Sequence, residues 1–203
     1  MKKRRAIFGN KPDMATPNPG GEPDVVESHP PVKASKLAPN ELGDAVARIA
    51  EGEVGVREEP ADSNRGPRVE LYQSADWLSC ETAYAYCASF VDWCVREAIE
   101  FTPVPWDRPR TAGAWDLERW ADEQGLSIIR RPGASAIRRG DIIVFTFSHC
   151  GIATGSPIGG IVPTVEANTT AGSGTLAQQR DGGGVYARER DLSLVRSRIR
   201  LSI

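Results

Sequence analysis

The chain has 203 residues, of which 40% are hydrophobic and 26% are charged, and its formal net charge at pH 7 is -2. These values predict a globular protein with one principal domain, and the balanced charge argues against nucleic acid as a partner. No apolar run is long enough to cross a bilayer, so we expect no stable membrane insertion. The basic start, residues 1–5, is not followed by an apolar core, which predicts cytoplasmic synthesis without a signal peptide.

The first segment of the chain is rich in Pro, Gly, Ser and charged residues. Its prolines interrupt any helical or strand period, which predicts a disordered tail over residues 1–38 and a folded domain over residues 39–203. His29 lies in this tail, where we expect it to be solvated.

Helical patterns dominate the first half of the domain. Apolar periods predict helices over residues 41–53, 67–78 and 111–124, with Gly125 as the stop of the last one. The polar loop over residues 54–66 is expected to be solvated, or else to form a rim that faces a substrate.

The strongest helical pattern runs from Tyr84 to Ala98. Its apolar residues follow the i, i+3, i+4, i+7 spacing of one helix face and are Cys87, Phe90, Val91, Cys94, Val95 and Ala98. Ser89, Asp92, Arg96 and Glu97 fall on the other face, which predicts a half-buried helix. Cys87 lies in the first turn, where the helix dipole lowers a thiol pKa, so it could act as a nucleophile. It could equally be a small buried hydrophobe.

After Gly125 the pattern becomes extended. Strands are predicted over residues 126–130, 142–147, 149–154, 162–168, 184–190 and 195–201. Helices followed by closely connected strands indicate an α+β fold, with N-terminal helices packed on a largely antiparallel sheet.

His149 is the only histidine of the predicted domain, and it starts a strand. A thiol nucleophile needs such a base, and the base needs a third group to orient it. Strand alternation places Glu166 and Asn168 on one face of the next strand. Either side chain could therefore fix the tautomer of the histidine and support its protonated form.

The other cysteines are Cys80, Cys94 and Cys150. A chain of this size without a signal peptide does not need disulfides, and close-spaced cysteine pairs typical of zinc sites are absent from the sequence. We expect Cys94 and Cys150 to be structural, with Cys150 pointing away from His149. The acidic residues of the 54–66 loop lack the register of a calcium loop. We therefore expect no metal and no cofactor.

Four motifs together resemble the cysteine, histidine-dependent amidohydrolase/peptidase (CHAP) family, within the papain-like NlpC/P60 group of cell-wall hydrolases. They cover residues 86–94, 140–145, 149–152 and 165–169, in the order of the family. The resemblance extends from Asn40 to the C-terminus. It implies a papain-like fold in which Cys87 is the nucleophile, His149 the base and Glu166 the orienting acid, with Asn168 as an additional or substitute partner.

Two residues depart from the family pattern. Tyr86 stands where the family usually has Trp, and Ala167 stands where Gly is common. Tyr86 preserves an aromatic wall, whereas Ala167 has less backbone freedom than Gly, which affects the position of Asn168 more than that of Glu166.

The resemblance implies a monomeric bacteriolytic peptidoglycan hydrolase. It would cleave an amide bond as an N-acetylmuramoyl-L-alanine amidase or a peptide endopeptidase, in the manner of a phage endolysin or a secreted effector. Such a protein would reach the cell wall through a holin or a secretion system. Two alternatives stay open: a thiol amidohydrolase with a non-wall substrate, and a catalytically silent wall-binding or structural module of a phage or secretion assembly.

Overall fold

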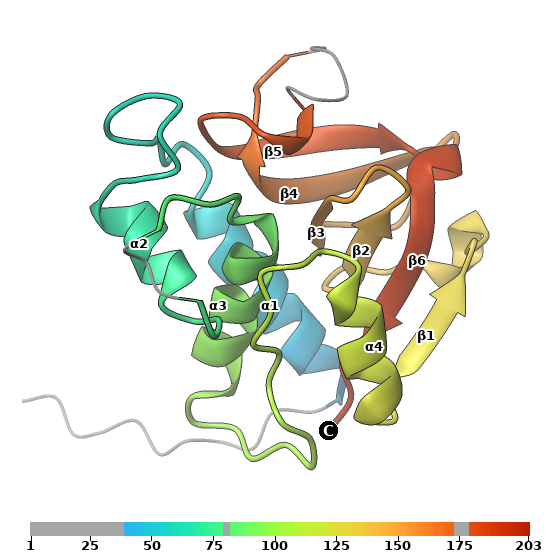
Figure 1. Cartoon of the computed structure of the whole chain (residues 1–203). Coiled ribbons are helices and arrows are strands. Elements are labelled where there is room, and N and C mark those ends of the chain that lie inside the picture. The colour runs from blue at the N-terminus through green and yellow to red at the C-terminus, as the bar shows by residue number, and fades with distance from the viewer. Residues whose placement is uncertain (1–38, 79–81, 173–178) are drawn as a thin grey trace, which may run out of the picture. The chain divides into compact units, whose positions relative to one another are not determined.

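The computed structural model describes residues 39–78, 82–172 and 179–203. The predicted tail and Cys80 lie outside this part of the chain. Within it, four helices precede a sheet of six strands (Figure 1). The predicted α+β class is confirmed.

The helices are α1 (Pro39–Gly52), α2 (Pro67–Gln73), α3 (Cys87–Ile99) and α4 (Asp116–Glu123). Helix α1 agrees with its prediction, and α3 begins at the cysteine that the pattern placed in its first turn. Helix α2 is shorter than predicted and ends where Ser74 donates its backbone N–H to the Glu70 carbonyl. Among the described helices we find none with the length and apolar character that a membrane span requires.

Helix α4 starts later than the predicted helix over residues 111–124. The backbone N–H of Thr111 donates to a carboxylate oxygen of Asp92 at 2.5 Å. Gly113 in turn donates its N–H to the Thr111 hydroxyl at 3.1 Å. These bonds hold residues 111–115 as a loop against α3, so the helix can begin only after them.

All six strands pair antiparallel in the order β1-β6-β2-β3-β4-β5. Their bounds are β1 Ser127–Arg130, β2 Ile142–Phe145, β3 Cys150–Ala153, β4 Ile161–Thr169, β5 Gly184–Asp191 and β6 Val195–Arg200. Each overlaps its predicted segment. Short 3-10 turns lie at Ala134–Ala136 and Leu192–Leu194.

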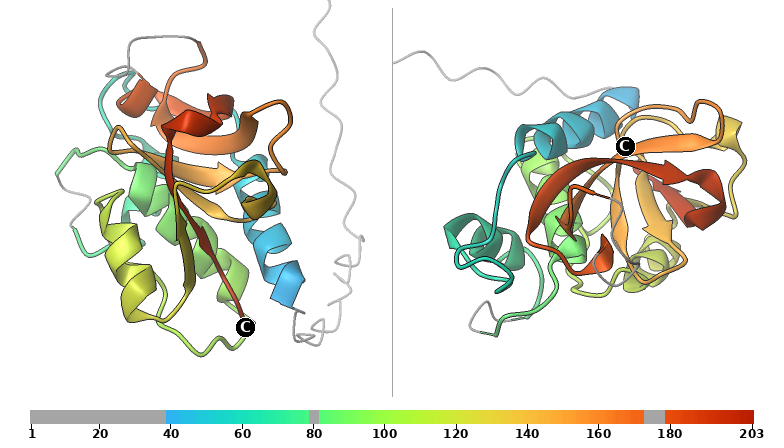
Figure 2. Two further views of the ribbon diagram at one scale, coloured as in Figure 1. Left: turned by 90° about the vertical axis from the view of Figure 1, so that its right-hand side faces the viewer. Right: turned by 90° about the horizontal axis from the view of Figure 1, so that it is seen from above.

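The sheet is twisted, and α1 and α3 pack on one of its faces (Figure 2). Val165 and Ala167 of β4 belong to the main core that this face shares with α3. Because side chains alternate along a strand, Glu166 projects to the opposite face. A smaller cluster that includes Phe145 fills that side of the sheet.

Helix α3 is more deeply buried than predicted. Ser89 and Asp92 were expected on a solvent face, yet both are fully buried. Loops cover that face and supply partners: the Ser89 hydroxyl donates to Asp76 at 2.5 Å, and Asp92 accepts from the Thr111 backbone. The periodicity could not reveal these covering segments, because they come from elsewhere in the chain. The helix that carries Cys87 is therefore fixed from several sides.

Candidate active site

Cys87 is the first residue of α3, and its side chain is 4% exposed. The first-turn N–H groups of a helix lack intrahelical acceptors, so they create a positive field that favours a thiolate. Tyr86 precedes it, is fully buried and stacks on Tyr72 with ring centroids 6.2 Å apart. The candidate nucleophile Cys87 therefore lies at the start of a buried helix, next to the packed aromatic ring of Tyr86.

His149 and Glu166 meet on neighbouring strands. His149 directly precedes β3, and its Nε2 lies 3.0 Å from Oε2 of Glu166 on β4. Both side chains are fully buried. A Cβ at Gly151 would lie 2.5 Å from Cγ of Glu166, so this position of β3 leaves room for the carboxylate only as glycine. The predicted base and its orienting acid are brought together.

A third strand fixes the Glu166 carboxylate. Arg190 of β5 donates from Nε to both carboxylate oxygens, at 2.8 and 3.1 Å, and a second guanidinium nitrogen binds Oε2. Thr164 donates its hydroxyl to Oε1 at 2.7 Å. Burial opposes the charge of Glu166, but the bonds from Arg190 and His149 outweigh it and lower the pKa of Glu166 to about 2. Glu166 is thus ionised over the physiological range.

Two aromatic rings orient the imidazole. Phe145 and Phe147 lie nearly parallel to the His149 ring, with centroids 6.0 and 5.8 Å away. The Arg190 guanidinium lies over both phenyl rings, at 5.5 and 5.4 Å. Arg190 therefore contacts the carboxylate and the rings at once. Arg190 is not among the predicted site residues. Strand periodicity predicted the strand that carries it, but not that its guanidinium contacts Glu166 on β4.

Cys87 and His149 stabilise one another as a charged pair. Burial lowers the pKa of His149, but the Cys87 thiolate and Glu166 outweigh it and raise this pKa to about 9. The pKa of Cys87 lies well below that of an ordinary thiol, because the Cys150 thiol donates a hydrogen bond to its sulfur and the imidazolium attracts the thiolate. Nδ1 of His149 is buried and forms no hydrogen bond of regular geometry in the described residues, so its attraction to the thiolate is chiefly coulombic. The resting pair is a thiolate and an imidazolium.

Cys150 differs from its expected structural role. It is fully buried, belongs to the core that contains α3, and hydrogen-bonds to Cys87. Burial raises the pKa of Cys150, so this thiol keeps its proton and can donate it to the neighbouring sulfur. Cys94 is buried without such a contact to Cys87, and burial raises its pKa too. Cys94 fits the structural role predicted for it.

Asn168 is not brought to His149. Its amide nitrogen donates to the Arg180 carbonyl at 3.0 Å and to the Asp181 carboxylate at 3.3 Å. The β4–β5 register shifts between Glu166 and Thr169, and Asn168 has φ 57°. Strand alternation is lost there, so the two side chains that were expected on one face lie in different surroundings. Of these two polar side chains, only Glu166 hydrogen-bonds to the imidazole in the described residues.

No family model matches this chain, and no curated protein is significantly similar to it.

The chemistry that the cluster could perform follows from its charged groups. Cys87, His149 and Glu166 form a buried row of a thiolate, an imidazolium and a carboxylate. This is the arrangement that activates a thiol for acyl transfer. Among the described residues, no group of three or more His, Cys, Asp and Glu side chains is placed to bind a metal ion.

Replacing Cys150 with alanine should raise the pKa of Cys87. The variant loses a hydrogen bond to the thiolate, so the protonated thiol gains relative stability. The pH profile of Cys87 alkylation by iodoacetamide would show its acid limb displaced by about one pH unit, since one charge-assisted hydrogen bond contributes about 1.5 kcal/mol. Cys94→Ala, which removes a thiol elsewhere on α3, should leave the limb in place. An unshifted limb in Cys150→Ala would contradict the contact.

Proposed function

We propose that the protein is a cysteine-dependent peptidoglycan hydrolase with a papain-like fold of the CHAP type, cleaving an amide bond of the cell wall as an amidase or endopeptidase. The observation that supports it most is the row formed by Cys87 at a helix start, His149 and Glu166. The α+β architecture with α3 packed on an antiparallel sheet is compatible with that fold.

The mechanism is acyl transfer. The Cys87 thiolate attacks the amide carbonyl, and the backbone N–H of Cys87, which has no intrahelical acceptor at the start of α3, donates to the developing oxyanion. The His149 imidazolium gives its proton to the departing amine, while Glu166 holds the ring in place. Water activated by the neutral imidazole then hydrolyses the thioester and restores the thiolate.

The charged pair predicts the pH range of activity. Cys87 must be deprotonated to act as a nucleophile, so kcat/KM falls in acid as its thiolate gains a proton. His149 must be protonated to give a proton to the departing amine, so kcat/KM also falls as the pH rises through the His149 pKa of about 9.

The decisive experiment digests purified peptidoglycan with the wild-type protein and with Cys87→Ala, and identifies the soluble products by mass spectrometry. We expect muropeptide release by the wild type and a loss of at least about a thousandfold in the variant, because the nucleophile is absent. The product masses identify the bond that is cut, because an amidase and an endopeptidase leave different chemical groups at the ends of the released fragments.

Cys94→Ala is the matched control, because it removes a buried thiol from the same helix without touching the row. Release by Cys87→Ala at the wild-type rate would reject the thiol mechanism. Failure of the folded wild-type protein on walls, with hydrolysis of other amides, would favour the non-wall amidohydrolase. Failure on every amide would favour a silent binding module. The export route through a holin or secretion system belongs to the same proposal.

A further inference from the structure

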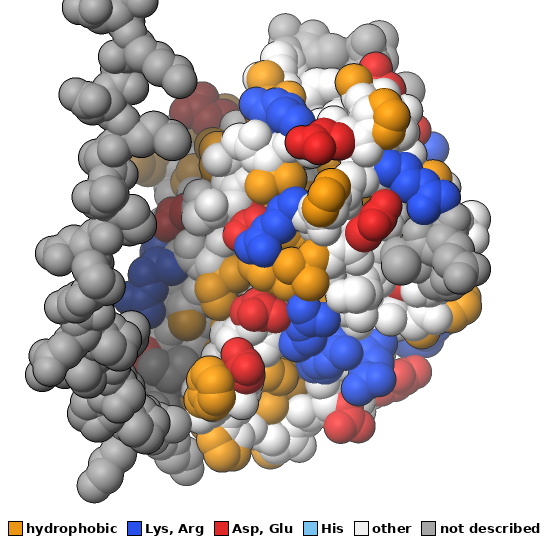
Figure 3. Space-filling view, turned by 90° about the vertical axis from the view of Figure 1, so that its left-hand side faces the viewer, with side chains coloured by type: hydrophobic (Ala, Val, Ile, Leu, Met, Phe, Trp, Pro, Cys, Tyr) orange, Lys and Arg blue, Asp and Glu red, His pale blue; other side chains and the backbone are white. Residues whose placement is uncertain are grey.

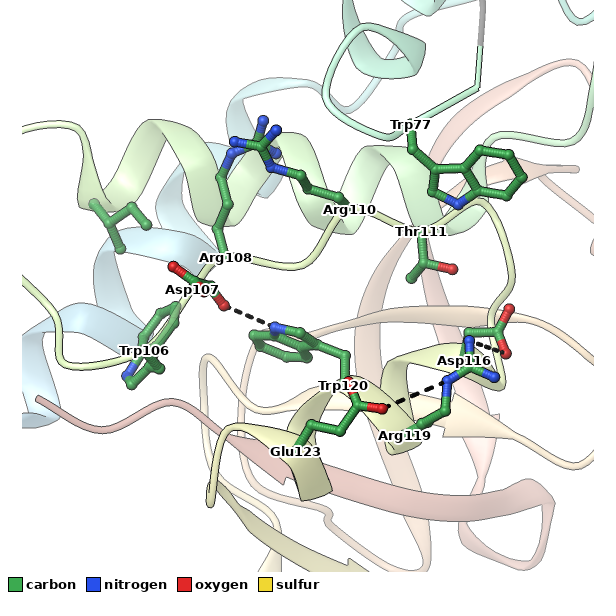
Figure 4. A pocket seen from close by; sticks show the side chains of 11 residues that line it. Trp77, Trp106, Asp107, Arg108, Arg110, Thr111, Asp116, Arg119, Trp120 and Glu123 are labelled. Atoms are coloured by element: carbon green, nitrogen blue, oxygen red, sulfur yellow. Dashed lines mark hydrogen bonds and ion pairs between the residues drawn. The ribbon is translucent and has the colours of Figure 1, made fainter.

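A cavity of about 730 Å³ lies beside α3, between the segment after α2 and helix α4 (Figure 4). Its volume is in the range of ligand pockets. Six of its lining residues are aromatic or basic: Trp77, Trp106, Trp120, Arg108, Arg110 and Arg119. The row described above does not include any of them.

Two arginines at one end of this pocket form no ion pair in the described part of the chain, although Asp107 also lines the pocket and the charge of Asp92 acts on Arg108. Figure 4 shows the guanidinium groups of Arg108 and Arg110 next to each other. Arg108 donates to the Ala75 carbonyl at 2.5 Å, but in the described part of the chain neither arginine has a carboxylate within ion-pair distance. Burial and the positive charge of Arg110 lower the pKa of Arg108. Paired guanidinium groups that form no ion pair favour an incoming anion.

On the opposite wall of the pocket, acidic side chains neutralise the charge of Arg119. Arg119 lies 3.2 Å from Asp116 and 4.0 Å from Glu123, so its charge is already compensated (Figure 4). Figure 3 shows the face that carries α2, where basic, acidic and hydrophobic side chains lie interspersed. An anion entering the pocket would therefore be drawn to the Arg108 and Arg110 end.

Tryptophan rings supply the remaining surface. Trp106 and Trp120 are buried, pack edge to face at 6.0 Å and form the base of the pocket. Trp77 is 71% exposed, which is unusual for so large an apolar ring. An exposed ring beside a basic end suits a ligand with both an extended apolar or amide surface and a negative charge.

The pocket adjoins α3, the helix that begins at Cys87. Thr111 lines it and is bonded to Asp92, which lies five residues beyond Cys87 on α3, or about 7.5 Å along the helix axis. Trp77 follows Asp76, whose carboxylate accepts a hydrogen bond from Ser89 in the first turn of α3. An extended peptide advances about 3.3 Å per residue, so about two residues span this axial separation between Cys87 and the segment that holds Thr111.

We propose that this pocket binds a free carboxylate of the stem peptide, gripped by Arg108 and Arg110, with the peptide chain lying against Trp77. The inference rests on the proposed function and makes the pocket the site that selects the substrate. Substrates with a free acid are preferred over amidated ones, and Arg108 and Arg110 act by positioning the substrate rather than by chemistry.

The test measures binding to Cys87→Ala protein by isothermal titration calorimetry, so that no hydrolysis occurs. The probe is N-acetylmuramoyl-L-Ala-D-isoGln-L-Lys-D-Ala, whose single free carboxylate is C-terminal, and the comparison compound is its C-terminal amide. We expect the acid to bind at least tenfold more tightly than the amide. Adding Arg110→Gln should abolish that preference, whereas Arg48→Gln, which changes an exposed side chain of α1, should retain it.

Arg110→Gln is a cleaner variant than Arg108→Gln, since Arg108 also supports the Ala75 carbonyl. Equal affinity for acid and amide, or a preference that survives Arg110→Gln, would overturn the inference. The binding result is independent of turnover. Carboxylate-dependent binding without wall hydrolysis by the wild type would therefore reject the proposed function and keep the pocket assignment, and hydrolysis without the preference would do the reverse.

Discussion

Replacing Glu166 with alanine should lower kcat/KM on peptidoglycan by about a thousandfold, while Asn168→Ala should cost less than tenfold. Glu166 accepts the Nε2–H of His149 at 3.0 Å and keeps the imidazolium oriented toward Cys87. Asn168 instead bonds to the Arg180 carbonyl. Steady-state kinetics of the two purified variants, with folding checked by circular dichroism, gives the ranking.

Glu166→Gln separates orientation from charge. The amide oxygen can still accept from His149, but it no longer stabilises the imidazolium by its charge, so the pKa of His149 should fall from about 9. The alkaline limb of the pH profile would then move to lower pH. Equal losses in Glu166→Ala and Asn168→Ala would contradict the assignment of Glu166 as the orienting residue.

Replacing Arg190 with leucine should destabilise the fold by about 3–5 kcal/mol, because it leaves the Glu166 carboxylate buried without its main partner. Arg190 is 2% exposed and Glu166 is fully buried, so water cannot replace the lost bonds. Urea denaturation followed by circular dichroism measures the free energy of unfolding. The surface variant Arg119→Ala, which removes two exposed ion pairs, should cost about 0.5 kcal/mol or less.

A double variant tests the cause. Arg190→Leu combined with Glu166→Gln removes the stranded charge, so it should be more stable than Arg190→Leu alone. If Arg190→Leu costs no more than the Arg119→Ala control, or if the double variant is the less stable one, the ion pair is not what holds β4 and β5 together at this site.

Local patterns predicted much of this protein. Apolar periodicity located α3 and put Cys87 at its start, and the change of period after Gly125 predicted the strands. Strand alternation predicted that Glu166 or Asn168 would reach His149 if their strands were neighbours, and the antiparallel pairing of β3 with β4 brings Glu166 to it. Short-range signals of this kind depend on the chain's own dihedral preferences and on burial of one face.

The rest depended on contacts between distant segments. Arg190 reaches Glu166 only through the β4–β5 register, and Cys150 reaches Cys87 only because α3 packs on β3. Burial of Ser89 and Asp92 likewise depended on loops that no periodicity describes. Sequence patterns therefore predicted a nucleophile, a base and an acid, whereas tertiary packing decided their protonation states and supports.

Asn168 shows most clearly where prediction from the sequence ends and tertiary structure decides. Alternation along a regular strand predicts that it shares a face with Glu166, and that prediction holds only while the backbone stays extended. The sequence determined the strand and its two polar residues. The register shift and the positive φ at Asn168 turned its side chain toward residues 180–181, because pairing with β5 and not the residue order fixes the backbone there.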